Sequence, residues 1–94
     1  MEKKFYYVYV LYSLKDHKMY IGYTTNLKRR LNEHKQGKTK STAPRRPLKL
    51  LFCDAYLSKA DAMRREKYFK TNPGKKTLKL MLRESLKEIV PGQP

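Results

Sequence analysis

The sequence contains a single cysteine, few acidic residues and no long uninterrupted hydrophobic run. One cysteine, Cys53, excludes an internal disulfide framework, as expected of a protein in a reducing compartment. Charges interrupt every apolar stretch, which argues against a transmembrane segment, and the opening residues MEKKFYYVYV lack the small-residue cleavage site of a signal peptide. We therefore expect a cytoplasmic protein with no membrane-embedded part.

The shortage of acidic residues leaves a large positive charge. Eight Asp and Glu oppose 23 Lys and Arg, which gives a formal net charge of +15. Such an excess disfavours the compact chain through self-repulsion and predicts a polyanionic partner. Nucleic acid is the first candidate and an anionic membrane surface is the second.

The length of 94 residues predicts one domain without internal repeats or linkers. We expect its core to cover about residues 4–90 and residues 91–94 to form a frayed tail. A hydrophobic fraction of 39% is low but sufficient for a small fold. Cys53 lies in the apolar run LLFCDAY, which predicts a buried structural thiol.

Aromatic and β-branched residues predict a hairpin near the start of the chain. Residues 5–13 and 19–24 read as two strands joined by a short polar turn. Alternation places Tyr9 on one face of the first strand and puts Tyr20 and Gly22 together on one face of the second. Both faces are apolar or aromatic, so we expect the hairpin to be covered on both sides.

A basic amphipathic helix follows the hairpin. Thr25 or Asn26 supplies its N-cap, and Gly37 provides a left-handed stop. Steps of three and four residues from the leucines of its apolar stripe land on Arg30 and His34. The helix therefore points an arginine and a histidine along the same face as its leucines.

The remainder of the chain alternates loops with regular elements. In chain order we expect a basic loop, a third strand, a second helix and a final amphipathic helix, over residues 38–47, 48–56, 59–71 and 75–90. Ser58 with Asp61 three residues later predicts a capping box. The tripeptide Asn72-Pro73-Gly74 predicts the end of the second helix.

The second helix carries one carboxylate where apolar residues are expected. Ala62, Met63 and Phe69 form its apolar stripe, and Glu66 lies within that stripe. A lone carboxylate on a buried face is costly unless it is neutralised, paired or bound to a metal. If the two helices pack on one face of the sheet, Glu66 meets the strand tyrosines, Arg30 and the histidine of the first helix.

Such a set could cleave a phosphodiester. The carboxylate could hold a hard divalent cation, and the cation and Arg30 could offset charge on the phosphate while a tyrosine or His34 handles a proton. Structural interpretations remain open for each residue. Glu66 could pair with a basic residue of a neighbouring helix, Arg30 could cover the core with its stem, and His34 could complement the helix dipole. Strand tyrosines are more often core than catalytic.

The order of these motifs resembles a known family. Tyr20 comes eleven residues after Tyr9, and Arg30 comes eight residues after Gly22. The successive segments are Tyr7-Val8-Tyr9, Tyr20-Ile21-Gly22, NLKRRLNEH and ADAMRREKYFK. Together they closely resemble the GIY-YIG nuclease domain in a small stand-alone form, with Tyr7 where the family name has glycine.

This resemblance implies an α/β (α+β) fold, a three-stranded antiparallel sheet flanked by about three helices. It also implies divalent-metal-dependent hydrolysis of nucleic-acid phosphodiesters. Tyr9 then matches the tyrosine proposed to help activate water, and Tyr20 matches the one that hydrogen-bonds around the nucleophile and phosphate. Arg30 matches the arginine that stabilises the phosphate, and Glu66 matches the glutamate that holds one Mg²⁺ or Mn²⁺ ion. His34 lies where several members place a histidine.

The resemblance extends to supporting residues and partners. Tyr7, Val8, Ile21 and Gly22 take structural positions, with Gly22 at the tight spot where its strand leaves for the helix. The implied substrate is nucleic acid, DNA in preference to RNA, in repair or recombination, cut by a monomer whose targeting a partner protein could supply. Basic residues of the first helix and the loop would hold the backbone: Lys28, Arg29, Lys38, Lys40, Arg45 and Arg46.

Two non-catalytic functions compete with the nuclease hypothesis. A nucleic-acid-binding module could use the aromatic strands as stacking platforms and the basic loop on phosphates. A basic adaptor on a nucleoprotein assembly is the third hypothesis, and the sequence does not separate it from the second.

Overall fold

The structure of the protein is a computed structural model that describes residues 4–89. In chain order its elements are β1 (Tyr6–Ser13), β2 (Met19–Thr24), α1 (Leu27–Lys35), the 3₁₀ turn η1 (Ala43–Arg45), β3 (Leu48–Tyr56), α2 (Lys59–Phe69), α3 (Asn72–Met81) and α4 (Arg83–Ile89). The expected helix end at Val90 and the expected tail at residues 91–94 lie outside the described residues. None of the helices within residues 4–89 has the length and apolarity needed to cross a bilayer.

β1 is the central strand of an antiparallel sheet with the order β2-β1-β3. Aromatic and β-branched side chains favour this extended backbone. The register pairs Tyr9 with Gly22 on one side and with Cys53 on the other. An irregularity after Val10 shifts the pairing between β1 and β3. The predicted three-stranded antiparallel sheet is confirmed, and β2 and β3 have the predicted bounds.

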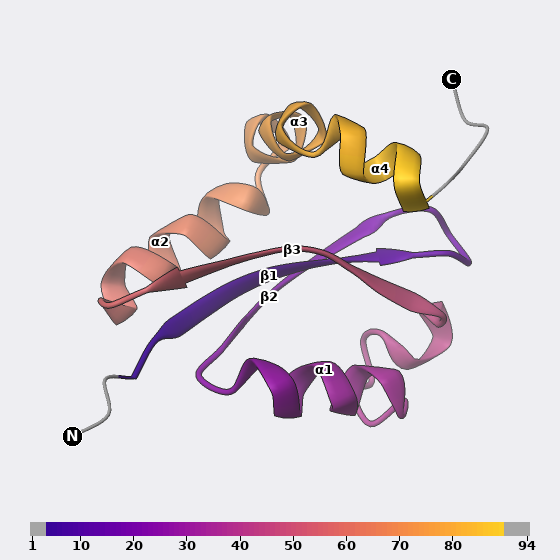
Figure 1. Cartoon of the computed structure of the whole chain (residues 1–94), viewed down its shortest axis with the longest axis horizontal. Helices are drawn as coiled ribbons and strands as arrows, with labels where there is room; N and C mark the ends of the chain where they lie inside the picture. The colour runs from indigo at the N-terminus through magenta and orange to yellow at the C-terminus, as the bar shows by residue number, and fades with distance from the viewer. Residues whose placement is uncertain (1–3, 90–94) are drawn as a thin grey trace.

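Helices cover both faces of the sheet (Figure 1). α1 lies against one face, and α2, α3 and α4 lie against the other. The hydrophobic core is on the second side and is formed by Val8, Val10, Ile21, Ala62, Phe69, Leu78 and Leu82. α1 and α2 therefore pack on opposite faces, so the condition under which Glu66 would meet the strand tyrosines and Arg30 on one face is not met. Because side chains alternate along β1, Tyr9 points away from this core and toward α1.

α1 begins and ends as its sequence predicts. The side chain of Asn26 accepts a hydrogen bond from the backbone N–H of Arg29 at 3.1 Å, which satisfies one of the free donors of the first turn. Gly37 follows the last turn with φ of +77°, the left-handed conformation that glycine adopts without steric cost.

The boundaries of the last helices differ from the predicted ones. α2 ends at Phe69, and Asn72-Pro73-Gly74 begins α3 instead of only ending α2. Proline fits a first helical turn because its missing N–H has no partner there. The predicted continuous final helix is interrupted at Leu82, so four α-helices flank the sheet within residues 4–89. The leucine spacing continues across this interruption, which is why hydrophobic periodicity alone did not predict it.

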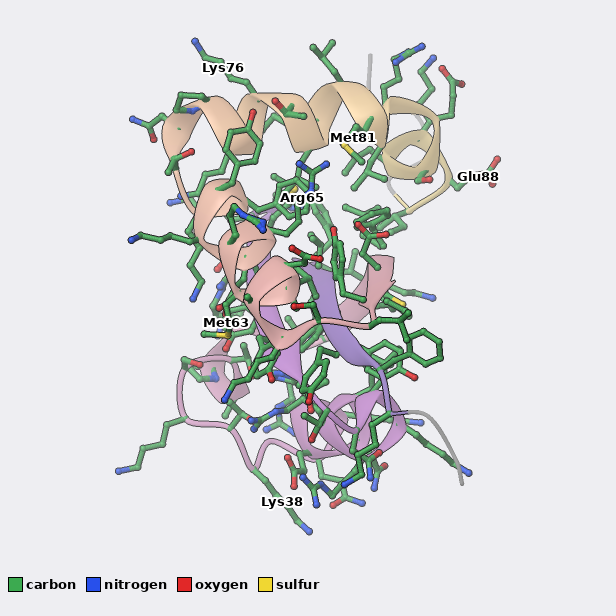
Figure 2. All side chains as sticks on the ribbon, turned by 90° about the vertical axis from the view of Figure 1, so that its left-hand side faces the viewer. Lys38, Met63, Arg65, Lys76, Met81 and Glu88 are labelled. Atoms are coloured by element: carbon green, nitrogen blue, oxygen red, sulfur yellow. The ribbon has the colours of Figure 1, made fainter. Side chains whose placement is uncertain are left out.

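Three further expectations, two on α2 and one on β3, are wrong. Ser58 occupies the N-cap position, but its side chain makes no capping hydrogen bond, and Asp61 pairs instead with Arg64 at 2.6 Å. Met63 lies on the outer side of α2 and is 42% exposed (Figure 2). Cys53 is exposed because it lies on the edge strand β3, where no neighbouring strand covers it.

The basic loop over residues 38–47 is fastened to the hairpin turn. The Ser13 hydroxyl donates to the carbonyl of Arg45 at 2.6 Å, and the Arg45 guanidinium pairs with Asp16 at 2.6 Å. The same guanidinium donates to the carbonyl of Lys18 at 3.1 Å. Arg46 donates to the carbonyl of Ala43 at 3.0 Å. The loop is therefore an ordered strap rather than a free basic segment.

Gly74 provides a test of how α2 and α3 pack. A Cβ atom at this position would overlap the carbonyl oxygen of Tyr68 and would also crowd the Cα of Phe69, at 2.8 Å. We expect Gly74→Ala to lower the free energy of unfolding by about 1–3 kcal/mol, because the backbone of α2 must shift to admit the methyl group. Urea denaturation followed by circular dichroism measures the change.

The neighbouring substitution Lys75→Ala is the matched control. Lys75 is exposed in the same first turn, so its replacement should change stability by less than about 0.5 kcal/mol. Equal unfolding midpoints for the two variants would show that the close approach at Gly74 does not limit packing.

Candidate functional site

Tyr9 lies at the centre of the candidate site. Its side chain is 1% exposed, and its ring lies directly over Gly22 of the neighbouring strand. A Cβ at position 22 would overlap the ring and hydroxyl of Tyr9. A glycine is thus required at position 22 because the ring of Tyr9 fills the space of its missing side chain. The reason is not the exit of the strand toward α1, as the sequence suggested. The absence of a side chain at Gly22 lets the hydroxyl of Tyr9 reach toward α1.

His34 receives that hydroxyl. Tyr9 Oη lies 2.7 Å from Nε2 of His34, and Nδ1 of the same ring lies 2.7 Å from Oγ1 of Thr42. The Thr42 hydroxyl donates onward to the carbonyl of Thr39 at 3.5 Å, so it accepts from Nδ1–H of His34. Nε2 then carries the lone pair and accepts a hydrogen bond from the hydroxyl of Tyr9. His34 and Thr42 are 2% and 0% exposed, so this chain of hydrogen bonds is shielded from water.

Tyr20 completes an aromatic cluster around His34. Its ring centroid lies 5.3 Å from that of His34 and 6.4 Å from that of Tyr9. The contact between Tyr20 and His34 is edge-to-face, an arrangement that stabilises aromatic pairs beyond their buried area. Tyr20 is only half-buried, which leaves part of its side chain at the surface of the site.

Arg30 lies at the rim of the cluster. Its side chain is 40% exposed, and its guanidinium is 3.4 Å from the carboxylate of Glu33. Glu33 also lies 3.9 Å from Arg29. The ion pair between Arg30 and Glu33 is too long and too exposed to hold the guanidinium of Arg30 firmly, because surface pairs of this kind contribute little. The head of Arg30 is available to a phosphate.

Burial and nearby charges shift the proton affinities of the two buried groups. Burial raises the pKa of Tyr9, the neighbouring Tyr20 adds to the effect, and the positive charge of Arg30 opposes it. Burial lowers the pKa of His34, and Arg30 lowers it further. At neutral pH the pair is therefore a neutral phenol and a neutral imidazole.

Glu66 approaches this cluster from α2, on the other side of the sheet. It lies on the buried stripe between Ala62 and Phe69, and its side chain is 16% exposed. The carboxylate pairs at 3.1 Å with Lys70, the C-cap residue of α2, and not with a residue of a neighbouring helix. Its negative charge contributes to the raised pKa of Tyr9, so the two groups are within electrostatic reach of each other.

The carboxylate of Glu66 fits a hard cation. Mg²⁺ usually binds proteins through one or two carboxylates and fills its other positions with water and phosphate oxygens. Within the described residues 4–89, no three of the His, Cys, Asp and Glu side chains gather into a metal-binding group. A metal here would therefore be held by Glu66 as the one protein carboxylate, with most of its coordination completed by water and substrate.

The predicted phosphate-binding residues divide into two groups. Lys28, Arg29, Lys38 and Lys40 are exposed, and Lys38 projects away from the body of the molecule (Figure 2). The guanidinium groups of Arg45 and Arg46 instead hold the loop together through the contacts described above. Of the four supporting motif residues, Val8 and Ile21 are buried in the core, Tyr7 is half-buried, and Gly22 makes room for Tyr9.

The sequence did not point to Thr42, the residue that orients His34. It lies in a loop without periodicity, and its burial depends on contacts between segments that are distant in the chain. Glu33 was also missed, because an acid on an exposed helical face carries no signal of its own. Ser13 could have been suspected as a polar residue ending a buried strand.

Comparison with known proteins identifies the family. A family model described as the GIY-YIG catalytic domain matches residues 5–79. A UPF0213 protein of Bacillus licheniformis is 39% identical over 95 residues, which cover 100% of this chain and 96% of that protein. A UPF0213 protein of Streptococcus agalactiae is 52% identical over 65 residues, which cover 68% of this chain and 73% of that protein.

A solved structure agrees with this assignment. The solution NMR structure of a UPF0213 protein from Bacillus halodurans matches with a TM-score of 0.57 and 33% sequence identity, over 95% of this chain and 99% of that one. The matched family model covers both tyrosine motifs, α1 and α2. The chain therefore belongs to the GIY-YIG family, and its relatives are UPF0213 proteins.

Proposed function

We propose that the protein is a divalent-metal-dependent endonuclease that hydrolyses nucleic-acid phosphodiester bonds. The observation that carries the proposal is the buried pair of Tyr9 and His34, whose hydroxyl and imidazole lie 2.7 Å apart beside Arg30. A buried phenol that is hydrogen-bonded to a neutral imidazole is arranged to pass it a proton.

In the proposed reaction, Tyr9 takes a proton from the attacking water and gives its own proton to His34. The raised pKa of Tyr9 makes a free phenolate costly, so transfer to Nε2 of His34 must accompany deprotonation of the water. Thr42 holds the imidazole in the tautomer that can accept this proton. His34 serves as the final proton acceptor on the protein. The water oxygen bonds to phosphorus as the P–O bond to the leaving oxygen breaks, and that oxygen takes a proton from solvent water.

The charge that develops on the phosphate is offset by residues at the rim. Arg30 offers a planar set of N–H donors that matches phosphate oxygens. Tyr20 has its side chain partly exposed beside His34 and orients the water and the phosphate. A divalent cation, Mg²⁺ or Mn²⁺, bound at Glu66 would supply additional positive charge at the phosphate oxygens.

The basic surface around α1 holds the rest of the substrate. Lys28, Arg29, Lys38 and Lys40 would contact backbone phosphates without reading sequence. We propose DNA in preference to RNA as the substrate and a monomer acting in the cytoplasm as the working form. Target choice would then come from the shape of the nucleic acid or from a partner protein.

A binding module without catalysis is the second candidate. The observation that favours it is the ion pair of Glu66 with Lys70 at 3.1 Å, which already neutralises the carboxylate. If that pair persists with substrate, Glu66 has no metal to hold and the aromatic cluster only binds. The following substitution separates the two functions.

Glu66→Gln tests the nuclease proposal because it keeps the shape of the side chain and removes its charge. We expect the rate of Mn²⁺-dependent cleavage to fall by about 10²–10³, the typical loss when one charge-stabilising group is removed. The assay incubates wild type and variant with single-stranded, duplex and branched DNA and RNA, with and without Mn²⁺. Thermal unfolding by circular dichroism verifies that the variant is folded.

The matched control is Glu84→Gln, which removes an exposed carboxylate that pairs only with Lys87 of α4. It should leave cleavage unchanged. Binding of these nucleic acids without turnover by wild type would sink the nuclease proposal and favour the binding module.

The burial of His34 predicts how stability depends on pH. Its pKa in the folded protein is below the ordinary value of 6.5, so below about pH 6.5 the unfolded chain binds a proton that the folded chain does not. The free energy of unfolding should therefore fall as pH drops from about 6.5 toward the folded pKa, by at most about 1.4 kcal/mol per pH unit from this residue.

His34→Gln should remove this contribution. Chemical denaturation at several pH values, over an experimental range of about 4.5 to 8, measures how the free energy of unfolding of each protein changes with pH. His17→Asn, which removes the exposed histidine of the turn and leaves His34 in place, should keep the fall of the wild type. Identical slopes for wild type and His34→Gln would contradict the assigned burial of a neutral imidazole.

A further inference from the structure

A second basic site lies between the hairpin turn and the last two helices. A groove of about 910 Å³ runs between them, and Figure 1 shows the turn joining β1 to β2 beneath α4. Its cationic lining comes from three separate parts of the chain: Lys18, Arg45, Lys75, Lys79, Arg83 and Lys87. Of the predicted phosphate-binding residues, Arg45 lines this groove, whereas Tyr9 and His34 do not.

Internal ion pairs neutralise only part of that charge. Asp16 is the one acid in the lining, and the hydrogen bond from Arg45 lowers its pKa to about 2, so it is ionised and committed to Arg45. Lys87 pairs with Glu84 at 3.4 Å. Among residues 4–89 no carboxylate forms an ion pair with Lys18, Lys75, Lys79 or Arg83.

This arrangement favours the binding of an anion. Lys75 and Lys79 are one helical turn apart and face the groove together with Arg83 and Lys18. Like charges gathered in a groove repel one another and concentrate anions from solution. On an ordinary solvated surface, lysines point in different directions. Lys76 of α3 shows this, since it points away from the groove side (Figure 2).

Aromatic rings in the same groove distinguish the class of anion. Tyr12 and His17 both line it, with ring centroids 6.2 Å apart and an interplanar angle of 51°. His17 is exposed and Tyr12 is half-buried. Cations beside accessible aromatic rings are the pattern of proteins that bind unpaired bases, since a base stacks on the ring while its phosphate meets the charge. A membrane headgroup or an acidic peptide would use the cations but not the rings.

The groove is separate from the candidate active site. Tyr9 and His34 face α1, whereas the groove is formed by α3, α4 and the far end of the hairpin, on the opposite side of the sheet (Figure 1). A nucleic-acid strand that occupied both sites would contact the protein in the groove and, further along the strand, at the phosphodiester beside Tyr9.

We propose that this groove binds a single-stranded segment of nucleic acid through its phosphates and unpaired bases. The proposal extends the proposed function by naming where an unpaired part of the substrate lies. Its test measures binding in EDTA, without turnover, so that its result is independent of whether the protein cleaves.

The test compares two variants of equal net charge. Lys75→Ala, Lys79→Ala and Arg83→Ala together remove three groove cations from exposed helical positions, where alanine favours the helix. The control replaces three exposed lysines outside the groove by alanine, at Lys59, Lys67 and Lys76. Fluorescence anisotropy then gives the Kd for a labelled oligothymidylate and for a hairpin duplex over a range of salt concentrations.

We expect the groove variant to bind the single strand roughly ten- to fifty-fold more weakly at physiological salt. The slope of log K against log salt should become shallower by about 2, since each phosphate contact on a single strand contributes about 0.7. The control variant should keep nearly the wild-type affinity for the single strand and nearly the wild-type salt slope. His17→Asn, which suits the positive φ of 59° at this position, should weaken binding about fivefold or more without changing the salt slope.

Three outcomes would overturn the proposal. The first is equal affinity of the groove variant and the control for the single strand. The second is a loss that is the same for duplex and single strand, which would make the groove a general anion surface. The third is a loss of binding to phosphatidylserine vesicles with no loss for the oligonucleotide, which would assign the groove to a membrane. Absence of cleavage by wild type would count against the nuclease proposal alone.

Discussion

The hydrogen bond between Tyr9 and His34 is the constraint on which the rest of the site depends. A phenol and an imidazole are buried together only if each finds a partner, because an unsatisfied polar group inside a protein is costly. The pair therefore requires an empty position at Gly22, a helix placed under the sheet and a threonine behind the imidazole. Each requirement fixes a different segment of the chain relative to β1. The site is thus assembled by satisfying one buried polar contact.

The two faces of the sheet perform different tasks. The face toward α2, α3 and α4 holds the apolar core, where Phe69 packs edge-to-face against Phe52 with ring centroids 6.3 Å apart. The face toward α1 is aromatic and polar and contributes less apolar burial. Glu66 belongs to the helix of the first face, yet its charge affects the phenol on the second. Stability and chemistry are therefore separated across a single layer of strands, with Glu66 linking them.

Much of the fold could be predicted from sequence because local patterns decide it. The alternation of aromatic and β-branched residues defined β1 and β2, and Asn26 and Gly37 bounded α1. Burial and partners could not be predicted so well, because they depend on distant segments. Cys53 reads as buried from its apolar neighbours but lies on an edge strand. Which face of the sheet a helix covers is likewise absent from its own sequence, and this is why the sequence left open whether α1 and α2 share a face.

The strap formed by residues 38–47 has a mechanical consequence. In the middle of the strap, Thr42 holds the imidazole of His34, and three residues later Arg45 is anchored to the hairpin turn by Asp16 and Ser13. Between them lies one tight 3₁₀ turn, which has little freedom to absorb a displacement. A ligand at the hairpin turn that displaced the strap would therefore change the proton affinity of His34. By thermodynamic reciprocity, protonation of His34 would then change the affinity for that ligand by the same factor.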